Sequence, residues 1–148
     1  CVVSPKPESM EEIMSISLEQ AQTAIAASIK KSNELGVKVA IAVLDDRAQI
    51  VAIARMDDAN FQFLPEAAQG KAMATVLWNG ATSGALTERS SMPIFAAVNQ
   101  MYGGKVIYQQ GAVPIMQSGK LVGAIGAGGA ASQVDEDIAQ AGADAISN

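Results

Sequence analysis

Two cationic side chains stand beside small or acidic neighbours, where a ligand could meet them. Arg55 ends a β-type run and is followed by Asp57 and Asp58. Its planar guanidinium suits a ligand carboxylate, and a local ion pair with those acids is the alternative interpretation. Lys71 lies among alanines and a glycine in residues 67–74, on the flank of a predicted apolar helix face. A partly desolvated amine there would act as a general base or carboxylate anchor, unless it reaches out to solvent.

The chain lacks the side chain that most often performs acid–base catalysis. None of its 148 residues is histidine, and its only cysteine is Cys1. Ser-His-Asp and Cys-His catalysis, imidazole metal sites, internal disulfides and cysteine zinc sites are therefore excluded within this sequence. Any catalysis falls to carboxylates, amines, guanidinium groups, hydroxyls or the backbone, with Lys71 as the candidate catalytic residue. Whether the protein is an enzyme stays open at this stage.

A glycine-rich segment lies between a predicted strand and the last predicted helix. Residues 126–131 read GAGGAA and fit the pattern G-x-G-x-x-A of nucleotide-binding loops. Asp135 and the acidic residues after it occupy the first turn of the following helix, where they would repel a pyrophosphate. We therefore expect Gly126, Gly128 and Gly129 to permit close approach of backbone or of a bound ligand.

The acidic residues at that helix start are also candidates for a metal site. Asp135 and Glu136 offer the hard oxygen ligands that divalent cations prefer. Residues two apart on a helix, such as Asp135 and Asp137, point to different sides. This arrangement favours helix capping over metal binding.

Charge and hydropathy exclude two classes of partner. Asp and Glu number 15 against 10 Lys and Arg, for a net charge of −5. The chain therefore lacks the basic surface that nucleic acids or anionic bilayers require. It also contains no apolar run long enough to span a membrane. The compartment is left open: a cytoplasmic location is favoured, and an exported form lipidated at Cys1 is the alternative.

Hydrophobic periodicity and turn signals predict the elements that must position these residues. Apolar residues at helical spacing predict four helices. The first follows a capping box at Ser17, the second and third begin at Pro65 and Pro93, and the fourth lies at the C-terminus. The β-type runs cover residues 37–44, 49–55, 105–109, 112–117 and 120–125. The order α-ββ-αα-βββ-α predicts an α+β domain with a five-stranded, mostly antiparallel sheet flanked by helices. A flexible tail over residues 1–14 precedes this single domain, residues 15–148.

The turn between the third and fourth predicted strands completes a hypothetical pocket. It contains a proline, which within a strand indicates an edge, a bulge or a ligand-facing bend. We hypothesise a pocket formed by Arg55, Lys71, this turn and the glycine-rich loop, because these polar and glycine-rich points remain once the core is assigned. The predicted ligand-binding residues are Arg55, Asp57, Lys71, Gly111, Val113, Pro114, Gly126, Gly128 and Gly129.

Short segments spread over residues 15–146 jointly resemble a known family. They are LGV at 35–37, AIAVLD at 40–45, ARMD at 54–57, GKA at 70–72, GAVPI at 111–115, GAIG at 123–126, DEDIA at 135–139 and AG at 141–142. Together they resemble the GlcG/HbpS-like family. This is the heme-degrading domain family that also forms the C-terminal domain of PduO-type cobalamin adenosyltransferases.

The resemblance implies a sheet and helices of the profilin or roadblock type, assembled into symmetric homo-oligomers. It also implies binding of heme or another tetrapyrrole, with heme degradation or iron binding in some members. Without histidine, iron ligation would fall to Met, Tyr or Lys, and the candidates are Met101, Tyr102, Tyr108 and Met116. The first functional hypothesis is therefore a heme-binding protein of this family, with heme degradation as a further activity.

A second hypothesis needs no cofactor. It is a binder or an enzyme for a small organic acid, with Arg55 and Lys71 as anchors for the anionic ligand. A third is an accessory subunit whose surfaces serve only assembly. All three predict a homo-oligomer, because helices rich in alanine, glycine and methionine can pack against copies of themselves.

Overall fold

The structure, a computed structural model, describes residues 15–147. The tail predicted over residues 1–14 and the role considered for Cys1 lie outside the described residues. The elements are α2 (Leu18–Leu35), β1 (Ala40–Asp45), β2 (Ile50–Arg55), α3 (Leu64–Leu77), α4 (Ser83–Thr87), α5 (Pro93–Met101), β3 (Ala112–Gln117), β4 (Lys120–Gly128) and α6 (Ser132–Ile146). The capping box predicted at Ser17 is present, with its side chain accepting from the Gln20 N–H.

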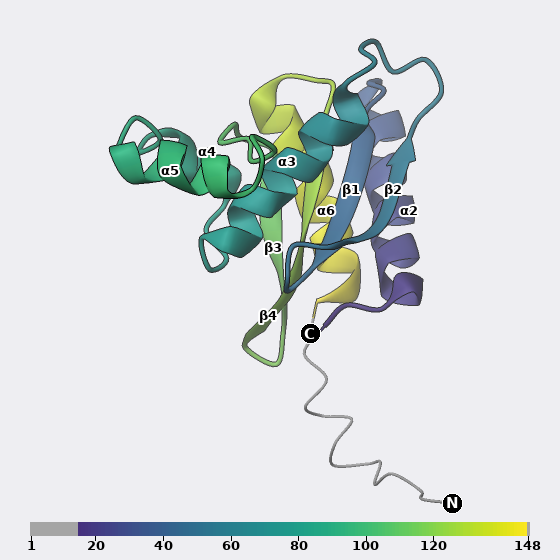
Figure 1. The fold of residues 1–148 in the computed structure, drawn as a ribbon. Helices are drawn as coiled ribbons and strands as arrows, with labels where there is room; N and C mark the ends of the chain where they lie inside the picture. The colour runs from purple at the N-terminus through teal and green to yellow at the C-terminus, as the bar shows by residue number, and fades with distance from the viewer. Residues whose placement is uncertain (1–14, 148) are drawn as a thin grey trace, which may run out of the picture.

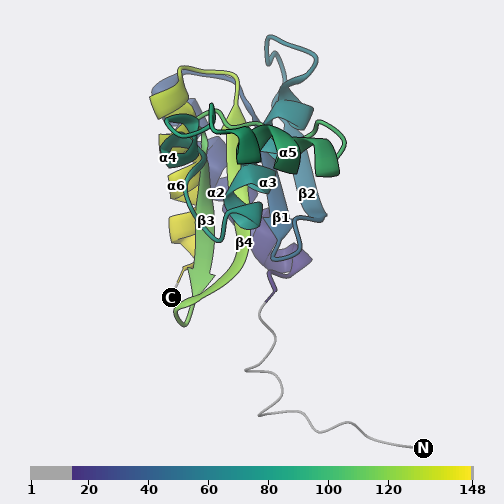
Figure 2. The ribbon, with the colours of Figure 1, turned by 60° about the vertical axis from the view of Figure 1, so that its left-hand side comes forward.

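The strands form one antiparallel sheet between two layers of helices. Their order in the sheet is β2-β1-β4-β3. Figure 1 shows α3 on one face of the sheet and α2 and α6 on the other. The short helices α4 and α5 follow α3 and extend to one side of the sheet (Figures 1 and 2). The α+β class and the antiparallel sheet flanked by helices are therefore confirmed.

The five-stranded sheet was a wrong prediction, because residues 105–109 do not join it. The sheet has four strands. In that segment the Val106 N–H donates to the side-chain oxygen of Asn99 at 2.8 Å. The Ile107 N–H donates to the carbonyl of Gly70, inside α3, at 3.1 Å. The β-type composition correctly indicated a half-buried apolar segment. The backbone N–H groups of this segment, however, donate to acceptors in helices α5 and α3 and not to a neighbouring strand.

Small residues bring α3 unusually close to the sheet. A Cβ on Gly126 of β4 would lie 2.5 Å from the carbonyl oxygen of Ala68 and 3.2 Å from the nitrogen of Ala72. Ala40 and Ala42 of β1 are buried on the same side. The opposite face packs larger side chains against α2 and α6, among them Ile41, Val43, Val113, Ile115 and Ile125. The alanine-rich and glycine-rich composition thus sets a short distance between helix and sheet.

Replacement of Gly126 with alanine is expected to lower the free energy of unfolding by about 1–3 kcal/mol, because the new methyl group overlaps the backbone of α3. A melting curve should shift by roughly 2–4 °C for each kcal/mol. Gly128→Ala is the matched control on the same strand, since its added Cβ meets nothing closer than 3.6 Å. Equal shifts for the two variants would contradict the contact argument.

None of the helices within residues 15–147 has the length and apolar character needed to cross a bilayer.

Candidate functional site

The Lys71 side chain runs from α3 toward the end of β4 and is buried. Only 8% of the side chain is exposed. Its ammonium donates to the carbonyl oxygen of Ala127 at 3.1 Å and to Oδ2 of Asp135 at 3.2 Å. The alternative that this lysine reaches out to solvent is therefore wrong. Because α3 lies so near the sheet, a side chain from its middle reaches the loop that leads into α6.

Asp135 ties that loop to Lys71. Its Oδ1 accepts from the N–H of Ala130 at 2.9 Å, while Oδ2 faces the ammonium. Burial raises the pKa of Asp135 above its usual value, although the Lys71 ammonium and the N–H groups of Ala130 and Gly129 act in the opposite direction. The helix itself has Ala131 as its N-cap, with no side-chain cap. The Asp135 carboxylate therefore fixes the glycine-rich loop and does not cap helix α6, although the sequence favoured a capping role.

The two candidate metal ligands do not converge. Asp135 faces Lys71, whereas Oε1 of Glu136 accepts from Nε2 of Gln110 at 3.2 Å. Within residues 15–147 no group of three or more acidic, histidine or cysteine side chains is placed to hold a metal ion.

Two of the predicted glycines, Gly111 and Gly129, make room for the lysine and for the loop. A Cβ on Gly111, whose φ is +146°, would lie 2.9 Å from Nζ of Lys71. One on Gly128 would lie 3.6 Å from the same nitrogen, which is an ordinary van der Waals contact. Gly129 has φ +136°, and a Cβ there would lie 2.8 Å from the carbonyl oxygen of Lys38. The glycine-rich loop thus allows close approach of backbone and of an internal ammonium, in line with the expectation from its sequence.

A cavity of about 490 Å³ opens beside the Lys71–Asp135 pair. This volume is within the range of about 300–1,000 Å³ that is usual for small-molecule sites. The lining residues are Phe61, Phe63, Leu64, Ala67, Lys71, Ile107, Gln109, Gly128, Gly129, Ala130, Ser132 and Asp135. We call it the α3 cavity.

The α3 cavity has an apolar wall and a polar end. Phe61 and Phe63 stack with ring centroids 5.3 Å apart and are 53% and 60% exposed. At the polar end, beside the buried ion pair, Nε2 of Gln109 donates to Oγ of Ser132 at 2.8 Å. This arrangement suits a ligand with a flat apolar body and at least one hydrogen-bonding group.

Sequence reasoning missed the aromatic wall. The signal was present, because Phe61 and Phe63 alternate around Gln62 immediately before the helix that Pro65 opens. Two aromatic side chains directly before the helix that carries Lys71 are the local indication of this wall.

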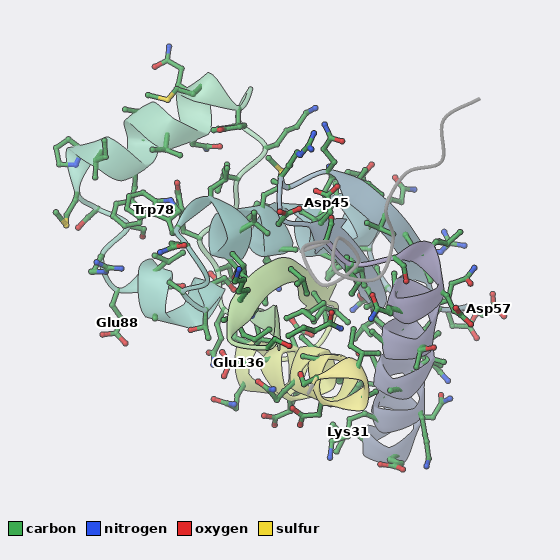
Figure 3. All side chains as sticks on the ribbon, turned by 90° about the horizontal axis from the view of Figure 1, so that it is seen from below. Lys31, Asp45, Asp57, Trp78, Glu88 and Glu136 are labelled. Atoms are coloured by element: carbon green, nitrogen blue, oxygen red, sulfur yellow. The ribbon has the colours of Figure 1, made fainter. Side chains whose placement is uncertain are left out.

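Arg55 and Asp57 lie elsewhere. They line a separate hollow of about 500 Å³ with Lys38, Asp58 and two apolar neighbours. Figure 3 shows Asp57 beside α2, well away from Glu136 at the start of α6. Within residues 15–147 the only ion pair is Lys71–Asp135, so the local pair considered for Arg55 does not form.

The remaining predicted ligand-binding residues are structural neighbours of the site and not part of its lining. Val113 belongs to the core between the sheet and helices α2 and α6. Pro114 is half-buried on the edge strand β3, and Gly126 lies under α3. The structure thus brings together Lys71 and three of the predicted glycines, while Arg55 and Asp57 stay apart.

The four candidate iron ligands also lie outside the lining of the α3 cavity. Tyr108 is held in an aromatic cluster, where its hydroxyl accepts from Nε1 of Trp78 at 3.2 Å and donates to the carbonyl of Phe95 at 3.3 Å. The other candidates are exposed on α5, just after it or on β3, and are Met101, Tyr102 and Met116.

A sheet of four antiparallel strands between helices, with an amphipathic cavity against a buried lysine, defines a small α+β domain. The chain belongs to the HbpS-like family, whose model, described as "Haem degrading protein HbpS-like", matches residues 16–144. The resemblance found in the sequence is thereby confirmed. A comparison with curated protein sequences gives no match.

Solved structures support the same assignment. The chain is 26% identical to a double mutant of HbpS from Streptomyces reticuli, with a TM-score of 0.79 and coverage of 100% of this chain and 98% of the other. A PduOC:heme complex is 25% identical, with a TM-score of 0.77 and coverage of 89% and 95%. Protein ORFY from Klebsiella pneumoniae is 24% identical, with a TM-score of 0.79 and coverage of 98% and 97%, and it shares the fold.

Proposed function

We propose that this protein binds heme or a related tetrapyrrole in the α3 cavity. The carrying observation is that an exposed, stacked Phe61–Phe63 pair and a buried ammonium line one cavity. A macrocycle offers a flat apolar face for the aromatic wall, and its propionates offer acceptors for Lys71. Membership of the HbpS-like family and the likeness to a PduOC:heme complex support the proposal.

The lining of the α3 cavity suits the porphyrin macrocycle but offers no common side-chain ligand for its iron. Its lining contains no histidine, cysteine, methionine or tyrosine, which are the side chains that commonly ligate heme iron. The protein's part would therefore be to hold the porphyrin by its faces and edges. Heme, when bound, would supply redox chemistry at its iron. Addition of ascorbate to the loaded protein, followed by loss of the Soret band, tests for the degradation named in the family description.

Titration of the full chain with hemin is expected to give a saturable Soret change at about one hemin per chain. Trp78 is the only tryptophan and should report binding by loss of its fluorescence. Replacement of both Phe61 and Phe63 with alanine should weaken binding by roughly tenfold, because two stacking contacts are lost.

The matched control replaces two exposed apolar side chains of α2 outside the cavity, Leu18 and Leu35, with alanine. This control should bind hemin as the wild type does. Hemin uptake without saturation, or an equal loss of affinity in both double variants, would argue against the α3 cavity as the heme site.

The homo-oligomer expected from the sequence stays a prediction. Helix α5 buries only Phe95 among its residues and leaves Ile94 and Met101 exposed, as is Met92 just before it. Residues 90–104 contain no charged side chain, so copies could meet there without charge repulsion.

A further inference from the structure

The buried ammonium of Lys71 has one donor to spare. An ammonium carries three N–H groups, and within residues 15–147 only the Ala127 carbonyl and Asp135 accept from it. The side chain is 8% exposed and lines the α3 cavity. A buried donor without an acceptor is unfavourable, so a ligand acceptor placed in the cavity would complete the hydrogen bonding of this group.

The charges around the cavity determine whether a neutral or an anionic acceptor can bind beside Lys71. Lys71 and Asp135 are the only charged residues in its lining, and they cancel. A ligand carboxylate beside Lys71 would therefore also meet a like charge on Asp135. Two other charged side chains, Lys38 and Glu136, lie outside the lining, where Lys38 donates to Asn33 and Glu136 accepts from Gln110.

The adjoining hollow, which shares Ile107 with the α3 cavity, adds one charge of each sign. It is lined by Glu66 and Lys105. These two charges belong to the lining of that separate hollow, and they also cancel. The like charge on Asp135 is therefore the main obstacle to an anion at the polar end of the α3 cavity.

We propose that the polar end of the α3 cavity is a carboxylate site for flat apolar acids, and that each acid bound there takes up one proton on Asp135. The location rests on the proposed function, but the ligand need not be heme. Lys71 stays an ammonium and donates its third N–H to the ligand. Protonated Asp135 keeps Oδ1 as the acceptor for Ala130 and uses Oδ2–H as a donor to the ligand carboxylate. No covalent bond forms or breaks apart from this protonation, and the proton comes from solvent.

Burial around Asp135 supports this scheme. It raises the pKa of that carboxyl group, so its protonated form is more accessible than that of an exposed aspartate. An anion bound alongside would raise the pKa further, because a second negative charge disfavours the ionised form. Proton uptake and anion binding therefore favour each other, and affinity should increase as the pH falls.

The same carboxylate chemistry has two sources, a heme propionate and a free aromatic acid. The probes are hemin with its dimethyl ester, and 2-naphthoate with its methyl ester. In each pair only the first member has a free carboxylate.

Calorimetric titration of the full chain with 2-naphthoate between pH 5.5 and 8.5 is the first test. The ligand stays ionised over this range. Affinity is expected to rise toward low pH by up to about tenfold for each pH unit, as one linked proton requires. Titrations in buffers of different ionisation enthalpy should show uptake of about one proton. The methyl ester should bind with no pH dependence.

Asp135→Asn keeps a carbonyl acceptor for Ala130 and removes the like charge. It should bind 2-naphthoate about tenfold more tightly than the wild type at pH 8 and lose the pH dependence. Asp144→Asn, an exposed aspartate on the same helix, is the matched control and should behave as the wild type. If Asp135→Asn fails to fold, the proton count of the wild-type protein still decides the question.

The outcomes separate this inference from heme binding. Hemin bound more tightly than its dimethyl ester, with 2-naphthoate not bound, supports the site and assigns the carboxylate to heme. Proton-linked binding of 2-naphthoate without hemin binding supports the site and removes the heme proposal. Acid and ester bound equally well in both pairs, or acid binding without proton uptake, overturns the inference and leaves heme binding to its own test.

Discussion

Replacement of Lys71 with methionine is expected to lower the free energy of unfolding by about 3–5 kcal/mol at pH 7, because it leaves the buried Asp135 carboxylate without its ammonium partner. The melting temperature should fall by roughly 10 °C, at 2–4 °C for each kcal/mol in a chain of this size. Methionine keeps the length of the side chain, so loss of charge is the main change. Thermal unfolding followed by circular dichroism measures the effect.

The loss of stability in Lys71→Met should increase with pH. The Lys71 ammonium lowers the pKa of Asp135, so its removal leaves that pKa raised further above the unfolded value of 3.8. A raised carboxyl pKa contributes stability that is fully present below the unfolded value and is lost as the pH rises through the folded value. The difference between wild type and variant should therefore be smallest below about pH 4 and grow toward neutral pH.

Lys120→Met removes an exposed lysine at the start of β4 and is the matched control. It should change stability by less than about 0.5 kcal/mol. A Lys71→Met variant that is equally destabilised at low and neutral pH would show that side-chain packing, and not the ion pair, dominates at this site.

Replacement of Phe95 with alanine should lower the free energy of unfolding by about 3–5 kcal/mol, the usual loss for a fully buried phenylalanine. Phe95 is 1% exposed. Its ring stacks on Trp78 at a centroid distance of 4.1 Å and meets the edge of Tyr108 at 4.9 Å. Since Phe95 is the only buried residue of α5, its removal should detach that helix from the end of α3.

Fluorescence of Trp78 gives a local readout of the same variant. Loss of the stacked ring should shift its emission to longer wavelength before global unfolding begins. Ile94→Ala, on the same helix and 48% exposed, is the control and should leave both the emission and the melting temperature nearly unchanged. An unaltered emission spectrum in Phe95→Ala would contradict the anchoring role of the aromatic cluster.

Residues 105–109, which were predicted to form a strand, show what a local sequence pattern can predict and what depends on tertiary packing. The apolar residues of this segment predict that it is buried, and Val106 is indeed buried. They do not report which backbone groups accept their hydrogen bonds. A carbonyl of α3 became available because Gly70 has no side chain, and a Cβ there would lie 2.5 Å from the carbonyl oxygen of Lys105. Only the packed structure contains that information.

The candidate site divides in the same way. Lys71 was recognisable because a charged side chain stood in a small and apolar helix segment, and the glycines because they clustered in a turn. Their meeting depends on how closely α3 approaches the sheet. Arg55 was an equally reasonable candidate by composition, but it lies on the β2 edge in a separate hollow with Asp57. Residue type identified the possible ligand contacts, while sheet order decided which of them share one space.

The sequence by itself determined the four longer helices, the segments that form the four strands of the sheet, the absence of histidine and the family. These depend on local periodicity, turn residues and composition. Only the tertiary structure decided that the sheet has four strands, that Lys71 pairs with Asp135 across 64 positions of chain, and that two phenylalanines form the wall of the same cavity. Such contacts arise from the packing of distant segments, which no local pattern specifies.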